Sequence, residues 1–167
     1  MRLETKRLTL RPWTPDDAGD LFRVASDPSV GNMAGWTPHR TLRDSRVMIR
    51  TRLASTETWA IVEKENGIVI GAIGLLFSDT SRLPLGPAEA EMFAWIGVPW
   101  WGRGYVAEAA EEVLRRAFED LDLSRVYTKR LQSNRQSGRV QEKLGFTLRS
   151  SDEDIEVRVL GNPNYEI

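Results

Sequence analysis

The stretch PWWGRGYVAEAAEEVLRRAF, residues 99–118, decides the fold. Two tryptophans precede a Gly-Arg-Gly, and apolar residues then recur at the spacing of one helix face. This apolar stripe consists of Val106, Ala110, Val113, Leu114, Ala117, Phe118 and Leu121. Strand patterns lie before the stretch, at 88–98, and after it, at 124–131. The sequence therefore predicts a parallel β-α-β crossover at this point.

The rest of the chain continues the alternation of strand and helix patterns. Further strands are predicted at 7–13, 58–64, 67–77, 146–151 and 154–160, and helices at 14–27, 42–53 and 134–146. Asp27-Pro28 is expected to end the first helix, and residues 31–39 to form a turn-rich loop. The predicted fold class is a single mixed α/β (α+β) domain over residues 1–167.

The composition excludes several classes of function. The 167 residues carry a net charge of −1, which gives no field for nucleic acid or an anionic membrane. There is no cysteine and a single histidine, His39, so disulfides, thiolate nucleophiles and multi-histidine metal sites are excluded. No apolar run is long enough for a membrane span. We therefore expect a cytoplasmic protein with no metal, nucleic-acid partner or membrane partner.

Gly102 and Gly104 fit two roles. They can form a structural turn before the helix. They can also let a phosphate approach the main chain at the helix N-terminus, where free N–H groups and the dipole attract anions. Arg103 would add a positive charge to such a loop. No Gly-Lys-Ser/Thr follows, and the glycine spacing differs from a dinucleotide-binding fingerprint.

Five separated segments carry a family resemblance, in order along the chain. WWGRGYVAEA resembles the acyl-CoA pyrophosphate loop of the GNAT superfamily of N-acetyltransferases. Residues 4–22 resemble the first strand and helix of the branch that contains the ribosomal-protein N-terminal alanine acetyltransferases. Residues 68–75 and 90–96 resemble the central strands, and 134–146 resembles the Asn-x-x-Ser…Glu-Lys-x-Gly-Phe helix.

The resemblance implies a GNAT-like fold with a mostly antiparallel sheet of six to seven strands and about four helices. Strands 88–98 and 124–131 would splay apart, and acetyl-CoA (coenzyme A) would lie in the gap. The implied cofactor-binding residues are Ile96, Val98, Trp101, Gly102, Arg103, Gly104, Tyr105, Val106, Asn134 and Ser137. Trp101 replaces the polar first residue of the family pattern, and Val106 is larger than the usual Gly or Ala.

The implied activity is transfer of an acetyl group from acetyl-CoA to a primary amine by direct attack through a tetrahedral intermediate. The acceptor is a protein N-terminus or a small amine, and a homodimer is possible because dimers are common in the family. The alternative is a non-catalytic acyl-CoA-binding sensor of the same fold. Direct attack needs no enzyme nucleophile, which fits a chain without cysteine.

The catalytic residues implied are Glu91, Ser137 and Asn134. Glu91 matches a family glutamate and would act as general base, but strand alternation also permits a solvated face. Relatives carry a tyrosine acid where this chain has Gln141, and a second glutamate where it has Lys129. Ser137 or a water is then the candidate acid, with Asn134 orienting it; Asn134 also suits a helix N-cap.

Tryptophans are the candidates for the amine-acceptor site. Trp36 and Trp95 are predicted to wall it, although core packing is the usual role of such side chains. His39, in a Pro-flanked loop, is expected to be exposed rather than catalytic.

Overall fold

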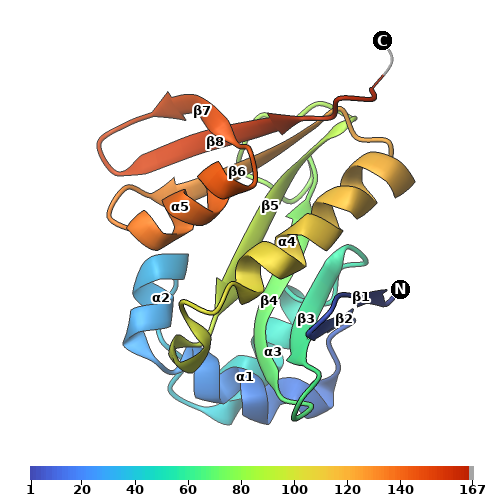
Figure 1. The fold of residues 1–167 in the computed structure, drawn as a ribbon. Helices are drawn as coiled ribbons and strands as arrows, with labels where there is room; N and C mark the ends of the chain where they lie inside the picture. Colours follow the sequence, from blue (N-terminus) through green and yellow to red (C-terminus); the bar gives the residue numbers. More distant parts are fainter. Residues whose placement is uncertain (166–167) are drawn as a thin grey trace. The chain divides into compact units, whose positions relative to one another are not determined.

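The computed structural model describes residues 1–165 and contains eight strands and five α-helices (Figure 1). The chain forms two compact units. The first comprises Met1–Gly74 and Ala94–Ala110, and the second comprises Leu75–Phe93 and the chain from Glu111 onward. The mixed α/β class is confirmed, with one strand and one helix more than expected.

The first unit contains an antiparallel series of strands. These are β1 (Leu3–Glu4), β2 (Leu8–Arg11), β3 (Thr58–Glu63) and β4 (Val69–Leu76). The carboxyl end of β5 (Glu89–Ile96) follows β4, and the Gly97 amide donates to the Ile70 carbonyl at 2.8 Å. The sequence missed β1 because a strand of two residues shows no alternation.

Helices of the first unit differ from the prediction at one point. The turn Pro15–Asp17 leads into α1 (Ala18–Ala25), and α3 spans Leu42–Thr51. Between them, α2 (Pro28–Ala34) occupies part of the segment expected to be a loop, so that expectation was wrong. The Asp27 side chain accepts from the Ser29 amide at 2.9 Å, and Pro28 takes the first helical position. Asp-Pro therefore ends one helix and also starts the next.

The second unit contains the parallel pair. The amino end of β5 pairs with β6 (Arg125–Leu131) from Glu89↔Arg125 to Glu91↔Tyr127. This confirms the crossover through α4 (Tyr105–Arg115), which ends in a π-helical turn at Arg116–Asp120. The ladder covers three residue pairs although β6 continues to Leu131. Its early end agrees with the expected splay of these two strands.

The remaining elements of the second unit lie beyond β6. Antiparallel pairing joins β6 to β8 (Ile155–Gly161) and β8 to β7 (Thr147–Ser151), while α5 spans Arg135–Lys143. Figure 1 shows β7 and β8 as one hairpin, drawn in red. The full strand order is β1-β2-β3-β4-β5-β6-β8-β7.

Burial along the strands identifies the core. Every residue of β3 is buried, as is nearly every residue of β4, which is typical of strands covered on both faces. The fully buried side chains include Leu8, Leu10, Leu21, Trp59, Ile61 and Ile73. Within residues 1–165, no helix combines the length and the apolar character that a bilayer crossing requires.

Candidate functional site

The glycine loop opens α4 with an accessible main chain. Gly102 and Gly104 have φ values of +73° and +76°, a conformation that favours glycine. Both glycines and Arg103 are exposed. The first amides of a helix have no partner within it, and in residues 1–165 no side chain accepts from the amides at 102–107. The loop therefore presents free N–H donors and a cation, which is the chemistry of an anion site.

Trp101 closes the connection between β5 and this loop. Its indole N–H donates to the Ile96 carbonyl at 2.9 Å, and its amide donates to the Val98 carbonyl at 3.1 Å. The Val98 amide has no partner within the described chain. These two hydrogen bonds hold Trp101 against the end of β5 and the residues that follow it. The structure brings Trp101 together with Ile96 and Val98, three of the predicted cofactor residues.

Hydrogen bonds from Thr5 and Arg7 to Glu108 hold the first turn of α4 to the N-terminal segment. The Glu108 carboxylate accepts from Thr5 Oγ1 at 2.5 Å, from the Arg7 amide at 2.9 Å and from Arg7 Nε at 2.7 Å. Burial would raise the pKa of Glu108, but these hydrogen bonds outweigh it and hold the pKa below its ordinary value. Arg7 also lies over the Tyr105 ring, with its guanidinium carbon 4.3 Å from the centroid.

Tyr105 anchors the loop on its other side. Its hydroxyl donates to Glu63 Oε2 at 2.5 Å, and both side chains are buried. The hydrogen bond from Tyr105 to Glu63 raises the pKa of the phenol. A Cβ built on Gly104 would lie 3.6 Å from Arg7 Nη2, so Arg7 adds positive charge beside the loop. The sequence analysis missed Arg7 and Glu63 because their partners lie far along the chain.

Glu91 is buried, not solvated. Only 4% of the residue is exposed. Its carboxylate accepts from Ser81 Oγ at 2.7 Å and pairs with Lys129 Nζ at 3.4 Å. The solvated-face alternative for Glu91 is therefore wrong, because β5 is covered at this point. Lys129 is the counter-ion of this candidate base.

Asn134 and Ser137 lie together at the start of α5. Asn134 Oδ1 accepts from the Ser137 amide at 3.1 Å, so the predicted N-cap role is present. Ser137 Oγ accepts from Gln141 Nε2 at 3.2 Å. Because that hydroxyl oxygen already accepts a hydrogen bond, its own hydrogen remains available for donation. Gln141 is buried, also donates to Thr128 Oγ1 at 3.3 Å, and leaves its own carbonyl oxygen without a partner.

Three tryptophans gather at the end of β5. Trp36 meets Trp95 edge-on at 4.8 Å between ring centroids, and Trp13 lies 6.2 Å from Trp95. The indole nitrogens of Trp13 and Trp36 are buried without a hydrogen-bond partner in the described chain. Unpaired buried donors are rare in proteins and call for an explanation, such as a ligand or a water. Trp13 was not foreseen, because a single tryptophan after a strand carries no periodic signal.

A pocket of about 370 Å³ adjoins Trp36 along the chain. Residues 37–40 line it together with Arg43, Asp44 and Val47 of α3. His39 is half-buried, and its Nδ1 shares a 2.8 Å hydrogen bond with Ser45 Oγ. The expectation of an exposed His39 was therefore wrong, because α3 packs its buried Ser45 against the ring.

Known proteins match most of the chain. The acetyltransferase (GNAT) domain model covers residues 7–147. "Uncharacterized N-acetyltransferase p20" of Bacillus licheniformis is 30% identical over 149 residues, which are 86% of this chain and 81% of that protein.

Solved structures show the same fold. An acetyltransferase from Agrobacterium tumefaciens has a TM-score of 0.76 at 29% identity, covering 96% of this chain and 94% of that one. A GNAT-family acetyltransferase from Bacillus anthracis has a TM-score of 0.85 at 19% identity, covering 97% and 99%. The family model and the curated relatives each cover more than four fifths of the chain, and the chain belongs to the GNAT family of N-acetyltransferases.

Proposed function

We propose that the chain transfers the acetyl group of acetyl-CoA to a primary amine, and that the loop Trp101–Val106 holds the pyrophosphate of the donor. The observation that carries this proposal is the open glycine loop at the start of α4. Gly102 and Gly104 have positive φ, the amides that follow are unpartnered, and Arg103 and Arg7 supply positive charge. A structural turn alone requires neither free amides nor two cations.

Direct attack then requires a base for the amine. A free alkylamine is protonated at neutral pH, since its pKa is about 10.4. Glu91 is the proposed base, acting directly or through a water, because it is a buried carboxylate on β5 held in place by Ser81 and Lys129. The ammonium group first gives one proton to this carboxylate, and the freed lone pair of the nitrogen then forms the bond to the thioester carbon. A main-chain amide of β5 stabilises the resulting oxyanion.

Collapse of the tetrahedral intermediate breaks the carbon–sulfur bond. The electron pair of that bond leaves on sulfur, and the attacking nitrogen loses its second proton to water. Ser137 relays a proton from water to the thiolate and so keeps its own hydroxyl. Ser137 is the proposed acid because Gln141 occupies its acceptor side and leaves the hydroxyl hydrogen free. Asn134 holds the Ser137 amide and thereby fixes the serine at the first turn of α5.

The proposed acceptor is a protein N-terminus or a small amine. Trp36 and Trp95 are proposed to wall its site, supported by the two indole N–H groups without partners at Trp13 and Trp36. The resemblance of residues 4–22 to the ribosomal-protein branch supports a protein N-terminus. A small amine is the other class.

Calorimetric titration with acetyl-CoA tests the donor site. The Gly104→Glu variant places a carboxylate beside the loop amides. Gly67→Glu is the matched control, since Gly67 has a similar φ of +70° in the exposed β3–β4 turn. Wild type and Gly67→Glu are expected to bind, and Gly104→Glu to lose at least about tenfold in affinity, or roughly 1.4 kcal/mol. No heat with acetyl-CoA or longer acyl-CoAs in the wild type would refute the proposal.

Thiol release with a panel of amines then separates an enzyme from a sensor. Turnover that requires both acetyl-CoA and an amine supports acetyl transfer. Binding without thiol release from any amine would instead support the non-catalytic alternative.

A further inference from the structure

Strand β6 of the second unit has one covered face and one open face. Val126 and Thr128 are buried, and Thr128 Oγ1 accepts from Gln141 of α5 at 3.3 Å. Tyr127 and Lys129 alternate with these residues along the strand and are only half-buried. Helix α5 therefore covers one face of this part of the sheet, and the side that carries Tyr127 and Lys129 is the open face.

The candidate base belongs to the open face. Lys129 Nζ lies 3.4 Å from the Glu91 carboxylate, so the two side chains are on the same side of the sheet. In the ladder between β5 and β6, Glu91 is the register partner of Tyr127. Ser81 Oγ covers the Glu91 carboxylate and donates to it at 2.7 Å. Tyr127 is therefore a half-exposed side chain directly beside the candidate base, within the same unit.

An apolar row extends from Glu91 across the open face. The ladder between β6 and β8 pairs Tyr127 with Val159 and Lys129 with Val157, which places both valines on this face. Both are half-buried although β8 is an inner strand of the sheet. Neighbouring strands lie about 4.8 Å apart, so this row reaches to about 10 Å from the main chain at Glu91. The open face thus offers an apolar surface that begins one strand away from the candidate base.

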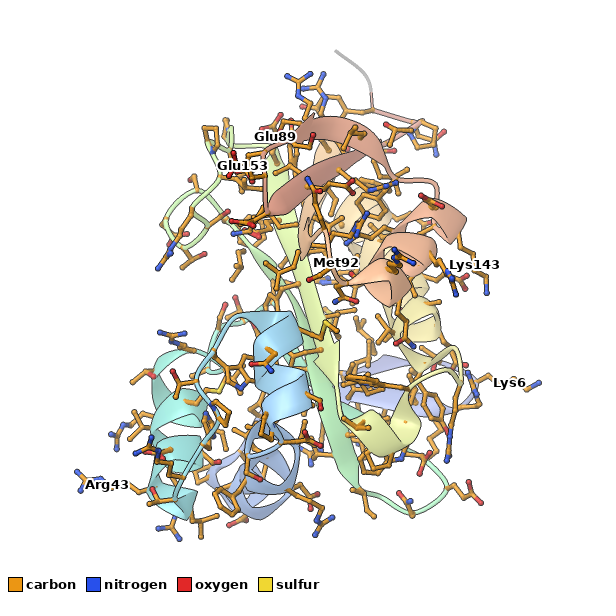
Figure 2. The ribbon with its side chains drawn as sticks, turned by 90° about the vertical axis from the view of Figure 1, so that its left-hand side faces the viewer. Lys6, Arg43, Glu89, Met92, Lys143 and Glu153 are labelled. Carbon is orange, nitrogen blue, oxygen red and sulfur yellow. The ribbon has the colours of Figure 1, made fainter. Side chains whose placement is uncertain are left out.

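The carboxylates of the open face are already paired. Figure 2 shows Glu89 of β5 toward the left of the β7–β8 hairpin, on the side away from α5. Glu89 Oε1 lies 3.2 Å from Arg125 Nη1, and Glu91 pairs with Lys129. Within residues 1–165, strands β5, β6 and β8 place no further carboxylate on this face. A second cationic group on an acceptor would therefore find no free carboxylate on these strands.

The main chain along the apolar row is also occupied. Tyr127 pairs with Glu91 on one side and with Val159 on the other, and Val159 pairs in turn with Thr147 of β7. A peptide that lay along this row would need partners for its own N–H and C=O groups. An apolar amine needs such partners only at its nitrogen. The row therefore fits a small apolar amine better than a peptide.

We infer that the open face binds the body of the acceptor, and that the acceptor is a small primary amine with one aromatic or branched apolar group. The nitrogen lies at Glu91, directly or through a water, and the apolar group packs against Tyr127, Val157 and Val159. The inference rests on the proposed acetyl transfer with Glu91 as base and narrows its acceptor. It assigns Tyr127, Val157 and Val159 to recognition, not to chemistry.

Acetyl transfer to a panel of amines provides the test. 2-Phenylethylamine and isopentylamine carry an apolar group, ethylamine carries none, spermidine carries further cations, and a tripeptide of alanine carries a main chain. Thiol release gives kcat and KM for the wild type and for Val157→Thr/Val159→Thr. Threonine has nearly the shape of valine, so this variant removes apolar contact without opening space. Val47→Thr is the matched control, because Val47 is an exposed valine on α3.

The expected result is a kcat/KM for 2-phenylethylamine at least about tenfold above that for ethylamine, with spermidine and the tripeptide poorer than 2-phenylethylamine. The double variant should raise the KM for 2-phenylethylamine by about fivefold and leave kcat unchanged, since it removes binding that is equal in the ground state and the transition state. Its KM for ethylamine should not change, and Val47→Thr should match the wild type with every amine.

Two sets of results would overturn the inference alone. If ethylamine, spermidine or the tripeptide is the preferred acceptor, or if the double variant keeps its KM for 2-phenylethylamine, the inference fails and the proposed function stands. If sedimentation shows a wild-type dimer that dissociates in the double variant while the preference among amines is unchanged, the open face belongs to a second copy of the chain. Thiol release with none of the amines would refute the proposed function, and the inference with it.

Discussion

The replacement Gly71→Ala tests the packing of β4 against β5. A Cβ built on Gly71 would lie 2.2 Å from the Trp95 carbonyl oxygen and 2.9 Å from the Ile96 Cα. Carbon–oxygen contacts between strands normally begin near about 3.3 Å. The two strands would therefore have to separate by about 1 Å, since both obstructing atoms belong to the main chain and cannot rotate away.

The expected cost is the sum of two effects. Overpacking of a tight core costs about 1–3 kcal/mol. The separation also stretches the buried hydrogen bond from the Gly97 amide to the Ile70 carbonyl, now 2.8 Å, which is worth about 1 kcal/mol. Alanine is otherwise more favourable than glycine in a regular element by about 0.5–1 kcal/mol. The clash exceeds this gain, so we expect a net loss of about 2–3 kcal/mol in the free energy of unfolding.

Urea unfolding followed by circular dichroism measures the loss. Gly19→Ala is the matched control, because nothing lies within 4 Å of a Cβ at this exposed position in α1. That variant is expected to gain about 0.5 kcal/mol. The reasoning would be refuted if Gly71→Ala unfolded within about 0.5 kcal/mol of wild type, the usual range of a surface substitution. Because Ile96 adjoins the clash, affinity for acetyl-CoA should fall in Gly71→Ala and stay unchanged in Gly19→Ala.

Two buried ion pairs provide further predictions. Burial alone would raise the pKa of Asp17, but the hydrogen bonds from Arg11 and Thr14 hold the pKa below its ordinary value. This carboxylate thus stabilises the fold above about pH 4, and its contribution disappears as the pH falls through the folded pKa. Asp17→Asn should lower the free energy of unfolding by about 2–3 kcal/mol at pH 7. Measured by urea unfolding at a series of pH values, the stability of this variant should fall less steeply toward acid pH than that of the wild type. An equally steep fall would contradict the prediction. Lys129→Met should cost about 1–3 kcal/mol by leaving Glu91 without its counter-ion. In a double-mutant cycle, Glu91→Gln should lower the free energy of unfolding by less in the Lys129→Met variant than in the wild type. If the two losses simply add, the two side chains are not coupled.

Local patterns of apolar and polar residues predicted most of the helices and strands. The apolar stripe after Gly104 predicted α4, and the strand patterns on either side predicted the parallel crossover that the β5–β6 ladder confirms. Helical and strand periods repeat within a few residues, so each can be recognised without knowing what packs against it. The two elements that escaped, α2 and β1, are short, and α2 begins at a proline that also reads as a helix stop.

In the candidate site, local patterns predicted the loop but not the distant residues that hold it. The glycine loop could be located from the sequence because its main-chain conformation depends on local residue types. The bracing by Thr5 and Arg7 through Glu108 could not, because these residues lie about a hundred positions apart and no period connects them.

Local residue patterns predicted most of the elements and the position of the loop, and the ordered motifs carried the resemblance to the GNAT family. Tertiary structure alone decided that Glu91 is buried and paired with Lys129, and that His39 lines a pocket with two unpaired arginines. Burial and pairing depend on which surfaces meet when distant segments pack together. A residue's own neighbours in the chain do not specify those surfaces.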